Sequence, residues 1–387
     1  MARATPTHSK PLGKLDGIRA APRAFSPAEL LNLWEPTGAW QEYRGLAYGE
    51  GSREKLDVYR PRRATKAPVL VFFYGGSWQR GSRDLYRFVG TALAAQGIVT
   101  VVPDYSIFPP ARFPMFVEDA ARAVRFARDH ATQWGGDPAR LVLMGHSAGA
   151  YIAAMLSFDP QWLQQVGLNS QADLAGFIGL AGPYDFLPIK SRTLRTIFGG
   201  ANRAETQPIS FVTGKEAPSL LITPWRDPLV SPENGRRMAE KIRAHGGVAE
   251  ERTYRGIGHL TLIGAFSPAL RILAPVLRDV TQFVWRVTRR ADSFHALIAL
   301  APSWWPGPRL GQDRVHAVER RSRSVPTGTD RRQFSGSCKR NRSGYALLRS
   351  VSADIHLPID RSSSAWRGLV VAPISKLASQ NFVGAPC

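Results

Sequence analysis

The stretch Leu141–Ala154, LVLMGHSAGAYIAA, constrains the fold more than any other part of the sequence. Its apolar start, Leu141–Met144, predicts a buried strand, and the small and apolar residues Ala150–Ala154 predict a helix packed close to a sheet. Between them lies a G-x-S-x-G motif at residues 145–149, with Ser147 at its centre. A strand, a sharp turn and a helix form the context in which this motif builds a nucleophile elbow. The alternative is a strand-to-helix turn with an N-capping serine.

Apolar strands alternate with helical segments along most of the chain. The expected strands are Tyr43–Tyr48, Lys55–Tyr59, Pro68–Tyr74, Ile98–Pro103, Leu174–Leu180, Ser219–Thr223 and Ala249–Tyr254. The expected helices are Asp84–Gln96, Phe116–Thr132, Pro232–His245 and Pro275–Val287. Strands that are apolar on both faces and separated by helices predict an α/β fold with a doubly wound, mostly parallel sheet. Residues 183–218 form an insertion where such a fold carries a small lid.

We expect three parts: a basic N-terminal arm (1–25), a catalytic domain (26–288) and a C-terminal tail (289–387). The 387-residue chain is 44% hydrophobic, enough for a sizeable core, and carries a net charge of +21. About half of that surplus lies from Arg286 onward, where 17 Lys and Arg face 6 acids. An Arg/Ser/Pro-rich tail rarely supports a packed core. It is either a disordered basic segment that touches anionic surfaces or the product of a wrong reading frame, which we favour.

Several function classes are excluded or disfavoured by composition. Both cysteines, Cys338 and Cys387, lie in the tail, which removes disulfide, metal-thiolate and Cys-nucleophile chemistry from the main body. We expect no metal site. Residues 1–14 lack a signal-peptide core, and no apolar run reaches the roughly 18–20 residues of a membrane span, so a cytoplasmic protein is expected. No pattern predicts nucleic-acid binding by the catalytic domain.

A candidate catalytic triad follows from the requirements of serine chemistry. Near neutral pH a serine hydroxyl needs a base, which is usually a histidine oriented by a carboxylate. Asp227 and His259 each follow a late predicted strand, and the order Ser147, Asp227, His259 is the one expected for this sheet topology. In the alternative interpretation, Asp227 is only a turn residue and His259 is only a loop residue. Asp185 and Glu233 are the other acids that could serve.

A glycine-rich loop after the strand Pro68–Tyr74 is the candidate oxyanion hole. A tetrahedral intermediate needs hydrogen-bond donors for its oxyanion, and glycines allow backbone amides to approach it. We expect the N–H groups of Gly76, Ser77 and Ala148 to donate, with Gly75 setting the turn. A plain Gly-Gly turn is the alternative. The candidates for the substrate pocket are Tyr74, Trp78, His146 and Trp225, and His146 is interpreted mainly as structural.

These residues resemble the α/β-hydrolase superfamily, in the esterase/lipase branch with hormone-sensitive-lipase-like carboxylesterases, feruloyl-esterase-like proteins and kynurenine formamidases. The resemblance runs from about Leu46 to Val287. The motifs that carry it are Tyr74-Gly75-Gly76-Ser77-Trp78, Asp104-Tyr105-Ser106, the elbow at 145–149, Ala181-Gly182-Pro183-Tyr184-Asp185, Asp227 and His259. Tyr74 stands where the family usually has a histidine that braces the oxyanion loop, so we expect altered loop geometry rather than its loss.

The resemblance implies hydrolysis of carboxylic esters or related amides through an acyl-enzyme, without a cofactor. The sequence therefore predicts a serine carboxylesterase that acts on small-molecule esters of small to medium acyl groups. One alternative is hydrolysis of an aryl formamide, as in kynurenine formamidases. Another is a non-catalytic ligand-binding module, because folds do not fix functions.

Overall fold

The computed structural model describes residues 31–32 and 39–299, with side chains described as far as residue 289. The predicted arm (1–25) lies outside the described residues. Most of the predicted tail also lies outside them, and its first residues, 289–299, continue the last helix.

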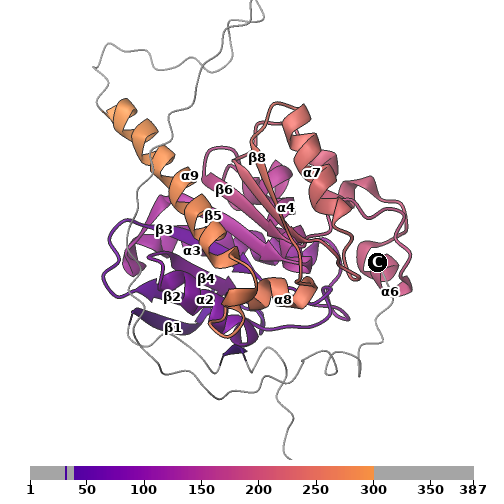
Figure 1. Cartoon of the computed structure of the whole chain (residues 1–387), viewed down its shortest axis with the longest axis horizontal. Helices are drawn as coiled ribbons and strands as arrows, with labels where there is room; N and C mark the ends of the chain where they lie inside the picture. Colours follow the sequence, from indigo (N-terminus) through magenta and orange to yellow (C-terminus); the bar gives the residue numbers. More distant parts are fainter. Residues whose placement is uncertain (1–30, 33–38, 300–387) are drawn as a thin grey trace, which may run out of the picture. The chain divides into compact units, whose positions relative to one another are not determined.

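The described residues form an eight-stranded sheet in the order β1-β2-β4-β3-β5-β6-β7-β8 (Figure 1). The strands are β1 (Trp40–Ala47), β2 (Lys55–Pro61), β3 (Ala67–Phe73), β4 (Val99–Pro103), β5 (Gly136–His146), β6 (Leu174–Leu180), β7 (Ser219–Pro224) and β8 (Ala249–Tyr254). Strands β3 to β8 pair in parallel, whereas β1 and β2 add an antiparallel edge. The mostly parallel sheet predicted from the apolar runs is confirmed.

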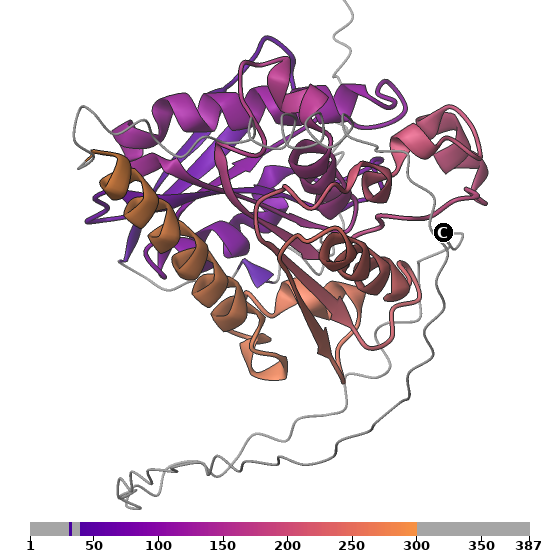
Figure 2. The ribbon, with the colours of Figure 1, turned by 90° about the horizontal axis from the view of Figure 1, so that it is seen from above.

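Helices cover both faces of the sheet, as Figure 2 shows for α3 and α9. The α-helices are α2 (Arg87–Ala94), α3 (Met115–His130), α4 (Ala148–Phe158), α5 (Pro160–Gln164), α6 (Arg192–Phe198), α7 (Glu233–Ala244), α8 (His259–Gly264) and α9 (Val276–Ala299). Helices α2 and α9 contact each other, α3 contacts α4, and α7 packs on β7 and β8. The predicted helix Asp84–Gln96 is shorter than expected, because its first turn is a separate 3₁₀ segment, Arg83–Tyr86.

The centre of the core is the packing of α4 against the strands beside it. Every residue of α4 is buried, because its sequence is apolar or small on all sides. A Cβ added to Gly149 would lie 2.0 Å from the Phe73 carbonyl oxygen, so only glycine permits this approach of α4 to β3. The start of α4 is thereby fixed at the carboxyl ends of the central strands, where parallel α/β sheets bind ligands.

The insertion at residues 183–218 contains α6 and two short 3₁₀ turns, Ala204–Thr206 and Pro208–Phe211. Its Phe198 packs on Trp78. The function of this segment as a lid stays a prediction. In the described residues, no helix is both long and apolar enough to cross a membrane.

Candidate active site

Ser147 lies in the sharp turn between β5 and α4, in the strand–turn–helix context that its motif predicts. Its backbone has φ 55° and ψ −124°, a strained conformation for a residue with a side chain. The turn is held because the Ser147 N–H donates to the Leu180 carbonyl oxygen at 2.8 Å. A Cβ on Gly145 would lie 2.1 Å from the Gly149 carbonyl oxygen, so the turn requires a glycine there. The hydroxyl-bearing side chain is half-buried.

Asp227 and His259 are brought together from two loops at the ends of β7 and β8. Nδ1 of His259 lies 2.6 Å from Oδ2 of Asp227. The other carboxylate oxygen, Oδ1, accepts the N–H groups of Leu229 at 2.8 Å and Val230 at 3.0 Å. Because a carboxylate only accepts hydrogen bonds, the proton of a neutral His259 ring lies on Nδ1 and a lone pair lies on Nε2.

His146, the residue before the serine, contacts the same histidine. The two rings lie 4.8 Å apart between centroids, and Nε2–H of His146 donates to the His259 carbonyl oxygen at 3.1 Å. Burial, with the neighbouring His259 adding to it, holds the pKa of His146 well below its usual range, so this ring is neutral. The interpretation of His146 as structural fits these contacts.

The backbone of Gly75 lies close to both Ser147 and His146. A Cβ added to Gly75 would lie 2.9 Å from Cβ of Ser147 and 3.0 Å from Nδ1 of His146. Among the described contacts there is no direct hydrogen bond between the Ser147 hydroxyl and the His259 ring. Nucleophile–base hydrogen bonds of this kind often tighten only when substrate binds.

The candidate oxyanion loop has an unusual backbone. Gly76, Ser77 and Trp78 have positive φ values of 144°, 53° and 57°. A Cβ on Gly76 would lie 1.9 Å from the Arg80 carbonyl oxygen, which makes glycine necessary there. Three consecutive residues in this region are held by surrounding structure, as is typical of loops that orient backbone amides.

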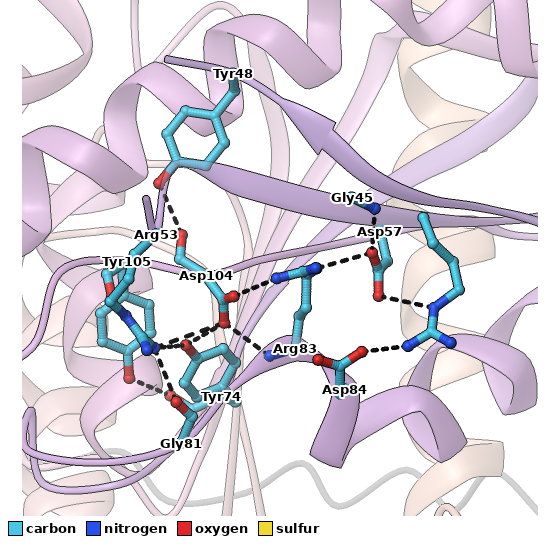
Figure 3. A network of polar contacts seen from close by, with 11 residues as sticks. Gly45, Tyr48, Arg53, Asp57, Tyr74, Gly81, Arg83, Asp84, Asp104 and Tyr105 are labelled. Carbon is cyan, nitrogen blue, oxygen red and sulfur yellow. Dashed lines mark hydrogen bonds and ion pairs between the residues drawn. The ribbon is translucent and has the colours of Figure 1, made fainter. Parts of the chain in front are cut away.

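Tyr74, at the start of this loop, lies in a buried polar network instead of an open pocket (Figure 3). Its hydroxyl donates to Oδ1 of Asp104 at 2.6 Å and accepts from Nη2 of Arg53 at 2.7 Å. Its ring stacks between Tyr86 and Tyr105, at centroid distances of 5.3 and 4.8 Å. Burial raises the pKa of Tyr74 well above its usual range, so the phenol stays a donor.

The same network holds the far end of the loop. Arg53 donates to the Gly81 carbonyl oxygen at 2.8 Å, and Nη1 of Arg83 donates to Oδ2 of Asp104 at 2.5 Å. Nε of Arg83 also donates to Oδ1 of the buried Asp57 at 2.8 Å, which joins the network to β2 (Figure 3). Sequence reasoning missed Arg53, Asp57 and Arg83. The available signal was the Asp104 motif, since a buried carboxylate requires cationic or N–H partners.

The chain is similar in sequence and fold to several known proteins. Residues 56–242 match the BD-FAE family model. The chain is 32% identical to Esterase LipC of Mycobacterium tuberculosis over 242 residues, 57% of this chain and 58% of that protein. It is 34% identical to a kynurenine formamidase of Salmo salar over 155 residues, 40% of this chain and 50% of that protein. The fold matches esterase B of Lactobacillus rhamnosis with a TM-score of 0.60 and 16% identity, over 70% of this chain and 93% of that one.

The chain has the α/β-hydrolase fold and is similar in sequence to esterases of that superfamily. It also matches a probable isoprenylcysteine alpha-carbonyl methylesterase, ICMEL1 of Arabidopsis thaliana, at 29% identity over 243 residues, 57% of this chain and 51% of that protein. The chain spans about half the length of the curated relatives it matches.

The remaining candidate residues lie in distinct surroundings. Trp78 is buried and packs edge-on against Tyr151 and Phe198. Trp225 is 53% exposed, on the loop that precedes Asp227.

The two other acids considered from the sequence have partners elsewhere. Asp185 forms an ion pair with Arg237 at 2.8 Å, and the exposed Glu233 pairs with Arg236. Neither has a described contact with His259. In the part of the chain that the structure describes, no group of three or more His, Cys, Asp or Glu could hold a metal ion.

Proposed function

We propose that this α/β-hydrolase is a serine hydrolase that cleaves carboxylic esters of small to medium acyl groups through an acyl-enzyme. The observation that carries the proposal is the buried Asp227–His259 pair, at 2.6 Å, in contact with the residue next to the strained Ser147. The esterase relatives support the same reaction class. The substrate is a small-molecule ester, and no cofactor takes part in the proposed steps.

In the first half-reaction, the Ser147 hydroxyl oxygen attacks the ester carbonyl carbon while Nε2 of His259 accepts the hydroxyl proton. Asp227 keeps the ring oriented and stabilises the imidazolium that forms. The N–H groups of Gly76, Ser77 and Ala148 stabilise the oxyanion of the tetrahedral intermediate. Collapse of that intermediate breaks the bond to the alkoxy oxygen, which takes the proton from His259 and leaves as the alcohol.

In the second half-reaction, water attacks the acyl-serine carbonyl carbon and His259 accepts a proton from that water. The same three amides stabilise the second oxyanion. The ester bond to Ser147 breaks, Ser147 regains its proton from His259, and the carboxylic acid leaves. The chain returns to its starting state with no net gain or loss of protons at the triad.

Hydrolysis of an aryl formamide is the second candidate function. The kynurenine formamidase relatives, 34% identical over 155 and 152 residues, support it as well as the esterases support the first. The steps are the same, except that His259 protonates an aryl amine as the C–N bond breaks. A panel of esters of increasing acyl length, with N-formylkynurenine included, separates these two functions.

The experiment that tests the proposed mechanism is hydrolysis of p-nitrophenyl acetate by the full chain and by Ser147→Ala. We expect the substitution to abolish turnover, and activity retained in the variant contradicts the mechanism. The non-catalytic interpretation requires that the wild-type protein hydrolyses nothing in the panel.

A further inference from the structure

A surface hollow lies on the two loops that carry Asp227 and His259. It is lined by Trp225, Arg226, Arg255, Gly256 and Ile257. Arg226 immediately precedes Asp227, and Ile257 lies two residues before His259. The Trp225 N–H donates to the Tyr254 carbonyl oxygen at 2.7 Å, which fixes the two loops side by side. The hollow therefore shares its framework with the proposed acid–base pair.

The chemistry of this hollow is cationic and aromatic. The Arg255 guanidinium lies over the exposed Trp225 ring, 4.6 Å from its centroid. Such stacking uses the face of the guanidinium and leaves its in-plane N–H groups available to an acceptor. Arg226 is exposed beside it.

Neither arginine of the hollow forms an ion pair within the described residues. Many other described arginines do, such as Arg83 with Asp57 and Asp104 and Arg236 with Glu233 and Glu240. Two guanidinium groups of like charge in one hollow repel each other, and an anion between them removes that repulsion.

We propose that Trp225, Arg226 and Arg255 form a subsite for an anionic group, a carboxylate or a phosphate, on the substrate. This proposal rests on the proposed function and specifies its substrate class: esters with a negative charge in the acyl or the alcohol part. The flat Trp225 face packs against the apolar part next to the anion, while the guanidinium groups donate to its oxygens.

The test compares an anionic ester with a neutral ester of the same shape. In the acyl arm, p-nitrophenyl hydrogen succinate is compared with its methyl ester. In the alcohol arm, p-acetoxybenzoate is compared with methyl p-acetoxybenzoate. Each arm gives the ratio of kcat/KM for the anionic ester to kcat/KM for the neutral ester. The intrinsic reactivities of the two esters cancel when this ratio is compared between protein variants.

We expect the double substitution Arg226→Gln/Arg255→Gln to lower this ratio about fivefold to twentyfold in at least one arm, through a loss of kcat/KM for the anionic ester. Added salt lowers the wild-type ratio in that arm, because screening weakens exposed charge pairs. The matched control is Arg62→Gln/Arg63→Gln, which removes the same charge from exposed positions in the turn after β2. The control leaves the ratio unchanged.

The subsite proposal is overturned if Arg226→Gln/Arg255→Gln leaves both ratios at the wild-type value, or if the control lowers them equally. The proposed function fails in a different way, through absence of neutral-ester hydrolysis or through activity in Ser147→Ala. In that event, calorimetric titration of Ser147→Ala with monomethyl succinate still decides the subsite. Binding that is lost when the two arginines are also replaced upholds it, and equal binding, or none in Ser147→Ala, overturns it.

Discussion

Oδ2 of Asp227 lies 2.6 Å from Nδ1 of His259, although 32 positions separate the two residues in the chain. The Asp227 side chain is fully buried, and its other oxygen already accepts two backbone N–H groups. Because hydrogen bonds engage both of its oxygens, the carboxylate is fixed in position. It therefore holds the His259 imidazole in one orientation and one tautomer.

The first prediction concerns this pair. Asp227→Asn keeps the size of the side chain but offers an amide N–H to Nδ1, which favours the wrong tautomer of His259. We expect kcat for p-nitrophenyl acetate to fall on the order of 10³- to 10⁴-fold with KM little changed. Steady-state kinetics checks this. Asp185→Asn is the matched control, since Asp185 pairs with Arg237. A comparable loss of kcat in Asp185→Asn would contradict the assignment of Asp227 as the acid of the triad.

The second prediction is a pH dependence of stability that comes from His146. Burial and the adjacent His259 hold its pKa well below the usual range. The unfolded chain therefore binds a proton below about pH 6.5 that the folded chain does not. Folding stability should fall as pH decreases below that value, by up to about 1.4 kcal/mol per pH unit from this group.

His146→Gln tests this origin, because glutamine has an N–H donor for the His259 carbonyl oxygen but no titrating group. Urea unfolding at several pH values from about 8 down to about 5 should give a shallower acid loss in the variant than in the wild type. Equal slopes in the two proteins would mean that His146 is protonated in the folded state.

The third prediction concerns the network below the oxyanion loop. Tyr74→Phe removes the hydroxyl that Asp104 and Arg53 share, and leaves a buried carboxylate with one partner fewer. We expect a loss of about 1–3 kcal/mol of unfolding free energy. Because this loop bears donors that act in the transition state, kcat should fall more than KM changes.

Tyr59→Phe is the matched control for Tyr74→Phe. Tyr59 is equally buried, but its hydroxyl has no hydrogen-bond partner among the described residues. Loss of the Tyr59 hydroxyl should leave the free energy of unfolding unchanged or raise it, and kcat should not change. Denaturant midpoints measure the effect on stability. A Tyr74→Phe protein as stable and as active as Tyr59→Phe would show that the network does not brace the loop.

The fourth prediction concerns the shape of the oxyanion loop. Gly76→Ala places a Cβ against the Arg80 carbonyl oxygen, so the loop must shift and its amides lose their alignment. We expect a decrease in kcat on the order of 10²- to 10³-fold. Gly246→Ala has a similarly positive φ, 84°, but no atom within 4 Å of the new Cβ. Gly246→Ala should lower the free energy of unfolding without lowering kcat. An equal decrease in kcat in the two variants would refute this role for Gly76.

The sequence allowed prediction of the features that depend on local pattern. Apolar runs marked β3 and β4 to within a residue or two, and the small residues after Ser147 indicated a helix packed close to the sheet. The loops after β7 and β8 contained Asp227 and His259, the residues that the structure brings together. The strand predictions succeeded because strand ends and tight turns are determined by residues next to each other in the chain. The catalytic roles of Asp227 and His259 stay predictions.

The features that escaped prediction depend on partners distant in the chain. Arg53, Asp57 and Arg83 lie in polar surroundings in the sequence, and only the folded sheet brings them to Tyr74 and Asp104. The hydrogen bond from His146 to the His259 carbonyl oxygen spans 113 positions. No periodicity indicates such contacts, because a side chain's polar partners are chosen by the tertiary structure.

The central claim is that the Ser147 hydroxyl is the nucleophile, and covalent labelling tests it most directly. The full chain is treated with a fluorophosphonate, and its intact mass and the modified peptide are determined, alongside Ser147→Ala. We expect one adduct per chain, on Ser147, and none in the variant. An unlabelled wild-type protein, or a label of equal extent in Ser147→Ala, would contradict the proposed mechanism.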